Sequence, residues 1–215
     1  MLGRWKDTSS SHHVGLFNVM KGVTLAAVGL VLLQLATSSL PHMRALMLVV
    51  AFLAVIISYN GAAVGTSVVN FHPSLIDVVL PMLMTVSELV LIARLGAEAG
   101  SGELPGDWLI ALGIWQLLAA LIVLSVAMRI RRSEYDIDAW TYVEQYRSRL
   151  RIDCGMAMIG AVAAMTFWMV RRDALPDADA PEYAFIAFVT AWFLAALRHH
   201  GAARRSLVRG FTSAP

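Results

Sequence analysis

Charged residues are scarce in this chain of 215 residues, and their scarcity excludes an ordinary soluble fold. Asp, Glu, Lys and Arg make up 15% of the residues, apolar residues make up 58%, and the mean hydropathy is +0.66. A soluble domain carries about 25% charged residues, because water must wet its surface. The net charge of +2 is too small to suggest a nucleic-acid partner. The composition predicts a compact helical membrane protein whose main partners are membrane lipids.

The sequence also lacks the motifs by which many enzymes and metal proteins are recognised. It contains no GxSxG, HExxH, P-loop or paired CxxC motif, and its single cysteine excludes an intramolecular disulfide. Haem or metal ligands between helices usually lie inside spans, whereas five of the six histidines fall at one predicted interface. We expect no catalytic residue, metal or cofactor. We expect these five histidines to be interfacial or pH-responsive, and they are His12, His13, His72, His199 and His200.

Six apolar runs are long enough to cross a bilayer, which takes about 20 residues of helix. Each run must be helical, because an unpaired backbone is costly in lipid and the alternating pattern of a barrel is absent. The sequence therefore predicts an all-α fold, a single domain over residues 1–215 that bundles six transmembrane helices. The spans lie near 14–36, 43–66, 74–95, 107–128, 152–170 and 183–197.

The distribution of positive charge predicts the orientation of the bundle. Thirteen of the seventeen basic residues fall on the side that would hold both termini. The opposite side has four basic residues and is rich in Asp and Glu. Cytoplasmic loops are the ones enriched in Lys and Arg. We therefore expect both termini in the cytoplasm of a multi-pass protein of the cell membrane, which we take to be a bacterial inner membrane.

One sizeable segment outside the spans, residues 129–151, has apolar residues at helical spacing among its arginines. It predicts a cytoplasmic amphipathic extension of the fourth or fifth helix that lies partly on lipid headgroups. The alternative is a docking surface for a partner protein, with Trp140, Tyr146 and Arg147 as the contact residues. Small residues recur along the first, second and fifth spans and allow close helix packing, either within the chain or in a homo-oligomer.

The third span carries the most conspicuous ionisable residue. An acid inside a membrane helix is expensive, so Glu88 is a functional candidate. Asp77 lies eleven residues earlier, almost three turns away and on the same face, and Pro81 shares that face. The spacing predicts a stripe of carboxylates that lines or gates a transport path. The alternative is a protonated Glu88 that merely bonds to a neighbouring helix.

Three further polar residues complete the predicted path. Gln116 on the fourth span lies at a depth comparable with Glu88, so a contact between them is possible. Lys21 lies a few residues inside the first span, where it can pair with Asp77 or snorkel to the interface. Asn60 lies in the same leaflet and would supply a neutral polar contact.

These residues support two main hypotheses for function. The first is a channel or transporter that moves an ion or small solute across the inner membrane, as an oligomer or with partner subunits. The second is a non-catalytic anchor or assembly subunit of a larger membrane complex. An intramembrane enzyme that acts on lipid is a third class, without a recognisable nucleophile or base. The environment of Glu88 separates them: a wetted cavity reaching its carboxylate favours transport, and a sealed bundle favours the anchor.

Overall fold

The computed structural model describes residues 2–36, 42–68, 75–97, 104–132, 137–174 and 179–212, and most of the side chains within these ranges. Within these ranges the regular structure is helical and contains no strand. The predicted all-α fold is therefore confirmed. The six helices are α1 (Leu2–Ala36), α2 (His42–Val68), α3 (Leu75–Ala97), α4 (Gly106–Arg129), α5 (Ile137–Ala174) and α6 (Asp179–Thr212).

All six helices are long and apolar enough to span a membrane, as the sequence predicts. Three of them are longer than their spans require. The 38 residues of α5 extend about 57 Å at 1.5 Å per residue, roughly twice the thickness of a hydrocarbon core. The amphipathic segment and the fifth span are therefore one continuous helix from Ile137 onward. α1 and α6 likewise continue beyond the predicted spans, with 35 and 34 residues.

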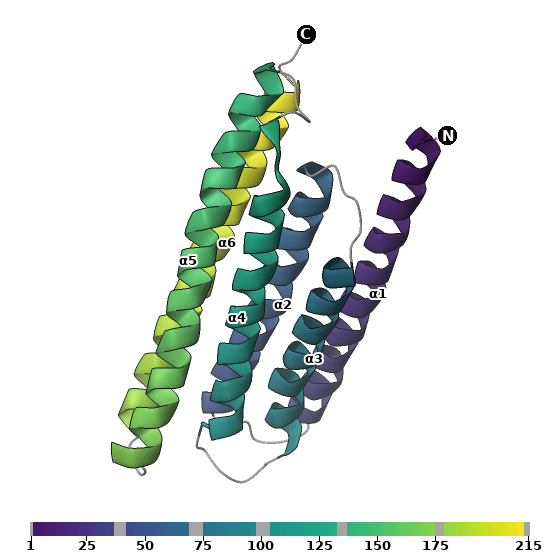
Figure 1. Ribbon diagram of the computed structural model, residues 1–215. Helices are drawn as coiled ribbons and strands as arrows, with labels where there is room; N and C mark the ends of the chain where they lie inside the picture. Colours follow the sequence, from purple (N-terminus) through teal and green to yellow (C-terminus); the bar gives the residue numbers. More distant parts are fainter. Residues whose placement is uncertain are drawn as a thin grey trace.

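The helices pack in two rows of three (Figure 1). One row contains α3, α4 and α5, with α4 packed against both of its neighbours. The other contains α1, α2 and α6, with α2 between the other two. Successive helices alternate in direction, so both termini lie at the same end of the bundle (Figure 1). We call this end the termini side, and the end where α2, α4 and α6 begin the opposite side.

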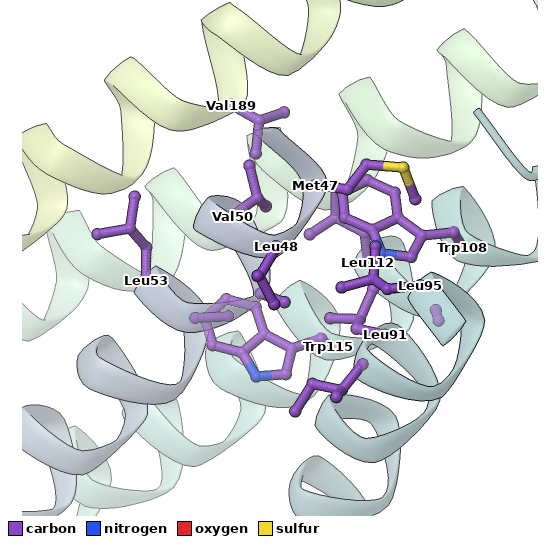
Figure 2. Close-up of a cluster of buried hydrophobic side chains, with 14 of the residues drawn as sticks. Met47, Leu48, Val50, Leu53, Leu91, Leu95, Trp108, Leu112, Trp115 and Val189 are labelled. Atoms are coloured by element: carbon purple, nitrogen blue, oxygen red, sulfur yellow. The ribbon is translucent and has the colours of Figure 1, made fainter. Parts of the chain in front are cut away.

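The main hydrophobic core lies toward the opposite side, where Trp108 near the start of α4 is fully buried. Met47 of α2 and Leu95 of α3 belong to the same cluster of side chains (Figure 2). Further along α4, the Trp115 ring packs against the tilted ring of Phe193 of α6, with ring centroids 5.3 Å apart. Large aromatic rings contribute much buried area, so this half of the bundle is closely packed.

Polar contacts reinforce the opposite side where the helices meet. The Glu182 carboxylate accepts the backbone N–H of Leu104 at 2.9 Å and pairs with the Arg171 guanidinium. Arg171 also donates to the Leu104 carbonyl. Buried Arg44 of α2 donates to the Leu95 carbonyl at 3.3 Å, near the end of α3. These contacts tie α4, α5 and α6 together just before α4 begins, and α2 to α3.

The outer surface of the bundle is apolar along every helix. Val19 and Leu33 of α1 are 66% exposed, and Val162 of α5 is 62% exposed. Exposed apolar area on this scale is typical of a surface that contacts membrane lipid or another protein. The chain is thus a multi-pass membrane protein whose outward side chains face lipid.

Candidate functional site

A partly open cavity of about 150 Å³ lies among the helices, and residues from all six of them line it. It runs from Trp115 and Phe193, where the core ends, toward the termini side. Tyr146 in the first part of α5 and His200 in the last part of α6 lie at that end. The closely packed core and the cavity therefore occupy different halves of the same bundle.

Most of the cavity wall is apolar, and a few polar side chains interrupt it. The apolar part includes Leu80 and Met84 of α3 and Ile122 of α4. The polar and ionisable lining residues come from α2, α4, α5 and α6 and are Ser58, Asn60, Gln116, Ser125, Tyr146, Asp153 and His200. A mainly apolar cavity with a few convergent polar groups is the usual form of a small-molecule site.

Glu88 forms a buried ion pair with Lys21. The Lys21 ammonium lies 2.5 and 2.6 Å from the two carboxylate oxygens, and the residues are only 2% and 1% exposed. The Ser58 hydroxyl and the Trp115 indole N–H contact the same oxygen, Oε1, at 2.7 and 3.3 Å. The ammonium also lies 5.4 Å from the centre of the Phe17 ring. Four helices, α1 to α4, thus converge on one charged pair.

The ion pair lies behind the cavity wall. Its neighbours Ser58, Trp115 and Phe17 line the cavity, whereas Lys21 and Glu88 are not among the lining residues. The carboxylate is satisfied by an ammonium and two hydrogen-bond donors, which is what a buried charge requires. Among the described residues, Ser58 and Trp115 both contact the Glu88 carboxylate and line the cavity.

The sequence suggested Asp77 as the partner of Lys21, and the structure gives that role to Glu88. Depth counted along each helix separately placed Lys21 only a few residues inside the first span, whereas Glu88 lies well inside the third. That count fails because helices shift along their axes to fit their neighbours, and α1 begins twelve residues before the predicted span. The side chain of Asp77 lies outside the described residues.

Gln116 and Asn60 both line the cavity, and their role in a transport path stays a prediction. Gln116 is buried, and its amide lies against Gly160 of α5: a Cβ atom added to that glycine would come within 1.8 Å of Oε1. The contacts described for Glu88 run to Lys21, Ser58 and Trp115, so the contact with Gln116 that depth allowed is not among them. α4 thus presents Trp115 to the ion pair and Gln116 to α5.

A second buried acid, Asp153, faces two histidines at the termini side of the cavity. Its Oδ2 lies 3.3 Å from His200 Nδ1, and its Oδ1 lies 3.5 Å from His199 Nε2. Asp153 is only 8% exposed. The sequence reading noted both histidines but overlooked Asp153, which follows a run of arginines and resembles an interfacial residue. The available signal was its spacing: Tyr146, Leu150 and Asp153 recur on one face of α5, and all three line the cavity.

The three residues predicted to bind a partner protein make contacts within the chain. Tyr146 is 5% exposed and packs with Val143 and Ile130 between α4 and α5. Arg147 donates to the Ala127 carbonyl at 3.2 Å, and the Trp140 ring lies under the Arg132 guanidinium at 5.3 Å. The segment is thus packed along the end of α4, and the docking surface stays a prediction.

The stripes of small residues divide between two environments. Ala161 and Ala164 of α5 are buried, as is Gly160, so this stripe serves packing within the chain. On α1, a Cβ atom added to Gly22 or Gly29 would meet nothing within 4 Å. No group of three acidic, histidine or cysteine side chains in the described part of the chain is arranged to hold a metal ion.

Comparison with known proteins finds no matching family model, no matching curated protein and no matching solved structure. Arguments about function therefore rest on the geometry of the cavity, of Asp153 on its wall and of Glu88 behind it.

Proposed function

We propose that this protein is a membrane carrier for a small, largely apolar solute that bears one or two hydrogen-bonding groups. The observation that carries the proposal is the cavity lined by all six helices, with Asn60 and Gln116 among the few polar residues on a mainly apolar wall. An apolar protein cavity of about 150 Å³ holds a molecule the size of benzene. The amides would orient the polar group of the solute, and the apolar wall would bind its remainder.

The chemistry of the wall favours a solute over a bare ion. An ion crossing the membrane needs charged or carbonyl-rich surroundings that replace its water. The carboxylate expected to attract a cation, Glu88, is already neutralised by Lys21 at 2.5 Å. In this proposal the pair holds Ser58 and Trp115 in position at the wall and does not meet the cargo. A role for Asp77 at the mouth of the path remains part of the proposal.

A carrier must open its cavity to each side in turn. The arrangement of packed core and polar contacts on the opposite side suits a state that admits solute from the termini side. We place that side in the cytoplasm of a bacterial cell, as the arginine distribution suggests. The outward-facing glycines of α1 would fit a homo-oligomer or a partner subunit, which stays a prediction.

Accessibility of an engineered cysteine tests the proposal without knowledge of the cargo. Replacing the only cysteine, Cys154→Ser, gives a background in which Asn60→Cys carries a single thiol at the wall. We expect a membrane-impermeant methanethiosulfonate reagent to label it in right-side-out vesicles and also in inverted vesicles. Labelling from one side only, or from neither, would contradict a carrier.

Two neighbouring alanines of α6 provide a matched test of the cavity. Ala196 lines it, and Ala195 is exposed on the outer surface. We expect Ala196→Phe to fill the cavity and to slow labelling of Asn60→Cys at least tenfold. Ala195→Phe adds the same volume toward lipid and should leave labelling unchanged. Equal rates in the two variants would show that the thiol is reached by another route.

A second candidate function, an anchor or assembly subunit, is favoured by the sealing of Glu88 and by helices that project beyond a bilayer thickness. Pull-down from native membranes tests it directly. A stoichiometric partner that is lost on Trp140→Ala would support this candidate. The carrier proposal would then depend on labelling of Asn60→Cys from both sides of the membrane.

A further inference from the structure

We propose that Asp153, His199 and His200 form a proton-binding site that couples opening of the cavity to proton movement. The inference rests on the proposed carrier function and names its coupling ion. The carboxylate comes from α5 and both imidazoles come from α6, so the site joins two helices at the termini side of the cavity. Asp153 and His200 both line the cavity, which places the site next to the cargo.

The distances between the Asp153 carboxylate and the two imidazoles are longer than those of strong ionic hydrogen bonds. Groups at such distances can bind or release a proton and can move apart. Charge-assisted hydrogen bonds are about 2.7–2.9 Å long. The contacts of Asp153 with the imidazoles are 3.3 and 3.5 Å. His199 Nε2 is buried and has no hydrogen-bond partner within the described part of the chain. A buried nitrogen left unsatisfied near a carboxylate would gain a partner when a proton binds, because both groups could then form a short ionic hydrogen bond.

The surrounding groups favour a proton over a larger cation. An imidazole nitrogen faces each carboxylate oxygen, so little of the carboxylate is left for an organic ammonium. Arg149 of α5 adds positive charge nearby, and its Nη1 is buried without a hydrogen-bond partner in the described residues. Tyr146, a further titratable group, lies on the same face of α5. The lining residues that α2 and α4 supply, including Asn60 and Ser125, are uncharged.

Protonation of the imidazoles should move α6 toward α5. Hydronium gives a proton to an imidazole nitrogen and leaves as water, and the cation formed is attracted to the Asp153 carboxylate. This attraction draws α6 toward α5 and narrows the termini side of the cavity. Release of the proton as hydronium leaves neutral imidazoles, and the two helices can separate again. Histidine is the side chain whose charge ordinarily changes between about pH 5 and pH 8.

The labelling experiment on Asn60→Cys can be extended to test this coupling. The measured quantity is the ratio of the termini-side to the opposite-side labelling rate, in which the pH dependence of thiolate formation cancels. We expect this ratio of termini-side to opposite-side labelling to fall about tenfold between pH 8 and pH 5. A tenfold change is an ordinary size for coupling between two sites. Asp153→Asn and His200→Gln should each flatten this response. His42→Gln, which changes an exposed histidine at the start of α2, should retain it.

Histidine NMR on the full-length protein in nanodiscs tests the site independently of transport. The His199→Gln and His200→Gln variants assign the two imidazole signals. We expect Asp153→Asn to lower the midpoint pH of the His200 signal by about one unit, because a neighbouring negative charge has been removed. Two-sided labelling with a pH-independent ratio would overturn the proton site and leave the carrier proposal intact. An unchanged His200 midpoint would overturn the site whatever the labelling shows.

Discussion

Glu88 and Asp153 are both buried in this bundle, and they differ in how fully their surroundings satisfy them. Glu88 has an ammonium at 2.5 Å, two further donors and no surface on the cavity. Asp153 has two imidazoles at more than 3 Å and lies on the cavity wall. A saturated charge holds helices in place, whereas a loosely paired one is free to change its protonation. Burial alone therefore does not distinguish an acid that holds helices together from one that can change its protonation.

Removal of one partner of the sealed pair should have the largest effect. Lys21→Met or Glu88→Leu leaves an unpaired charge in the bilayer interior and should lower the free energy of unfolding by about 3–5 kcal/mol. The double variant removes both charges and should recover most of that loss. Unfolding in mixtures of SDS and mild detergent measures all three. Single variants that unfold like the wild type would remove the distinction between the two acids.

A change in the packing of α4 against α5 should have the next largest effect on stability, because α4 carries Trp115, which donates to the Glu88 carboxylate. A Cβ atom on residue 160 would overlap the Gln116 amide, at 1.8 Å from Oε1 and 2.5 Å from Cδ. We expect Gly160→Ala to cost about 1–3 kcal/mol in the same unfolding assay. Gly155→Ala is the matched control, since its Cβ would meet nothing within 4 Å. Equal stability of the two variants would contradict the close packing of Gln116.

The neutral donors of Glu88 should contribute less than its counter-ion. Ser58→Ala and Trp115→Phe each remove one hydrogen bond, which is worth about 1 kcal/mol, or somewhat more when the acceptor is charged. The serine contact at 2.7 Å is shorter than the indole contact at 3.3 Å, so we expect the serine variant to lose more. The reverse order in the unfolding assay would mean that the Trp115 ring stabilises mainly through packing.

Much of the fold was predictable from the sequence, because twenty-residue apolar runs have few alternatives in a membrane. The six spans and the choice of Glu88 as a candidate residue follow from that reasoning. The burial of Lys21 does not, because its place near the end of the span also allowed it to snorkel to the interface. The pairing of Lys21 with Glu88 was not predictable from depth, because the axial offset between α1 and α3 depends on side-chain packing along both helices. Asp153 was missed for a related reason. Only the placement of α6 beside α5 brings His199 and His200, almost fifty residues away in sequence, to its carboxylate.

Neutralising the second acid should have the smallest effect on stability and so provides the sharpest test of the comparison. Asn retains the shape of Asp and its capacity to accept a hydrogen bond, and the imidazole contacts of Asp153 are long. We therefore expect Asp153→Asn to change the free energy of unfolding at neutral pH by less than about 1 kcal/mol. The unfolding assay used for Glu88→Leu allows direct comparison. A loss as large as that of Glu88→Leu would mean that Asp153 is a structural charge like Glu88. Only a small loss, together with a flattened pH response, assigns the two acids to different tasks.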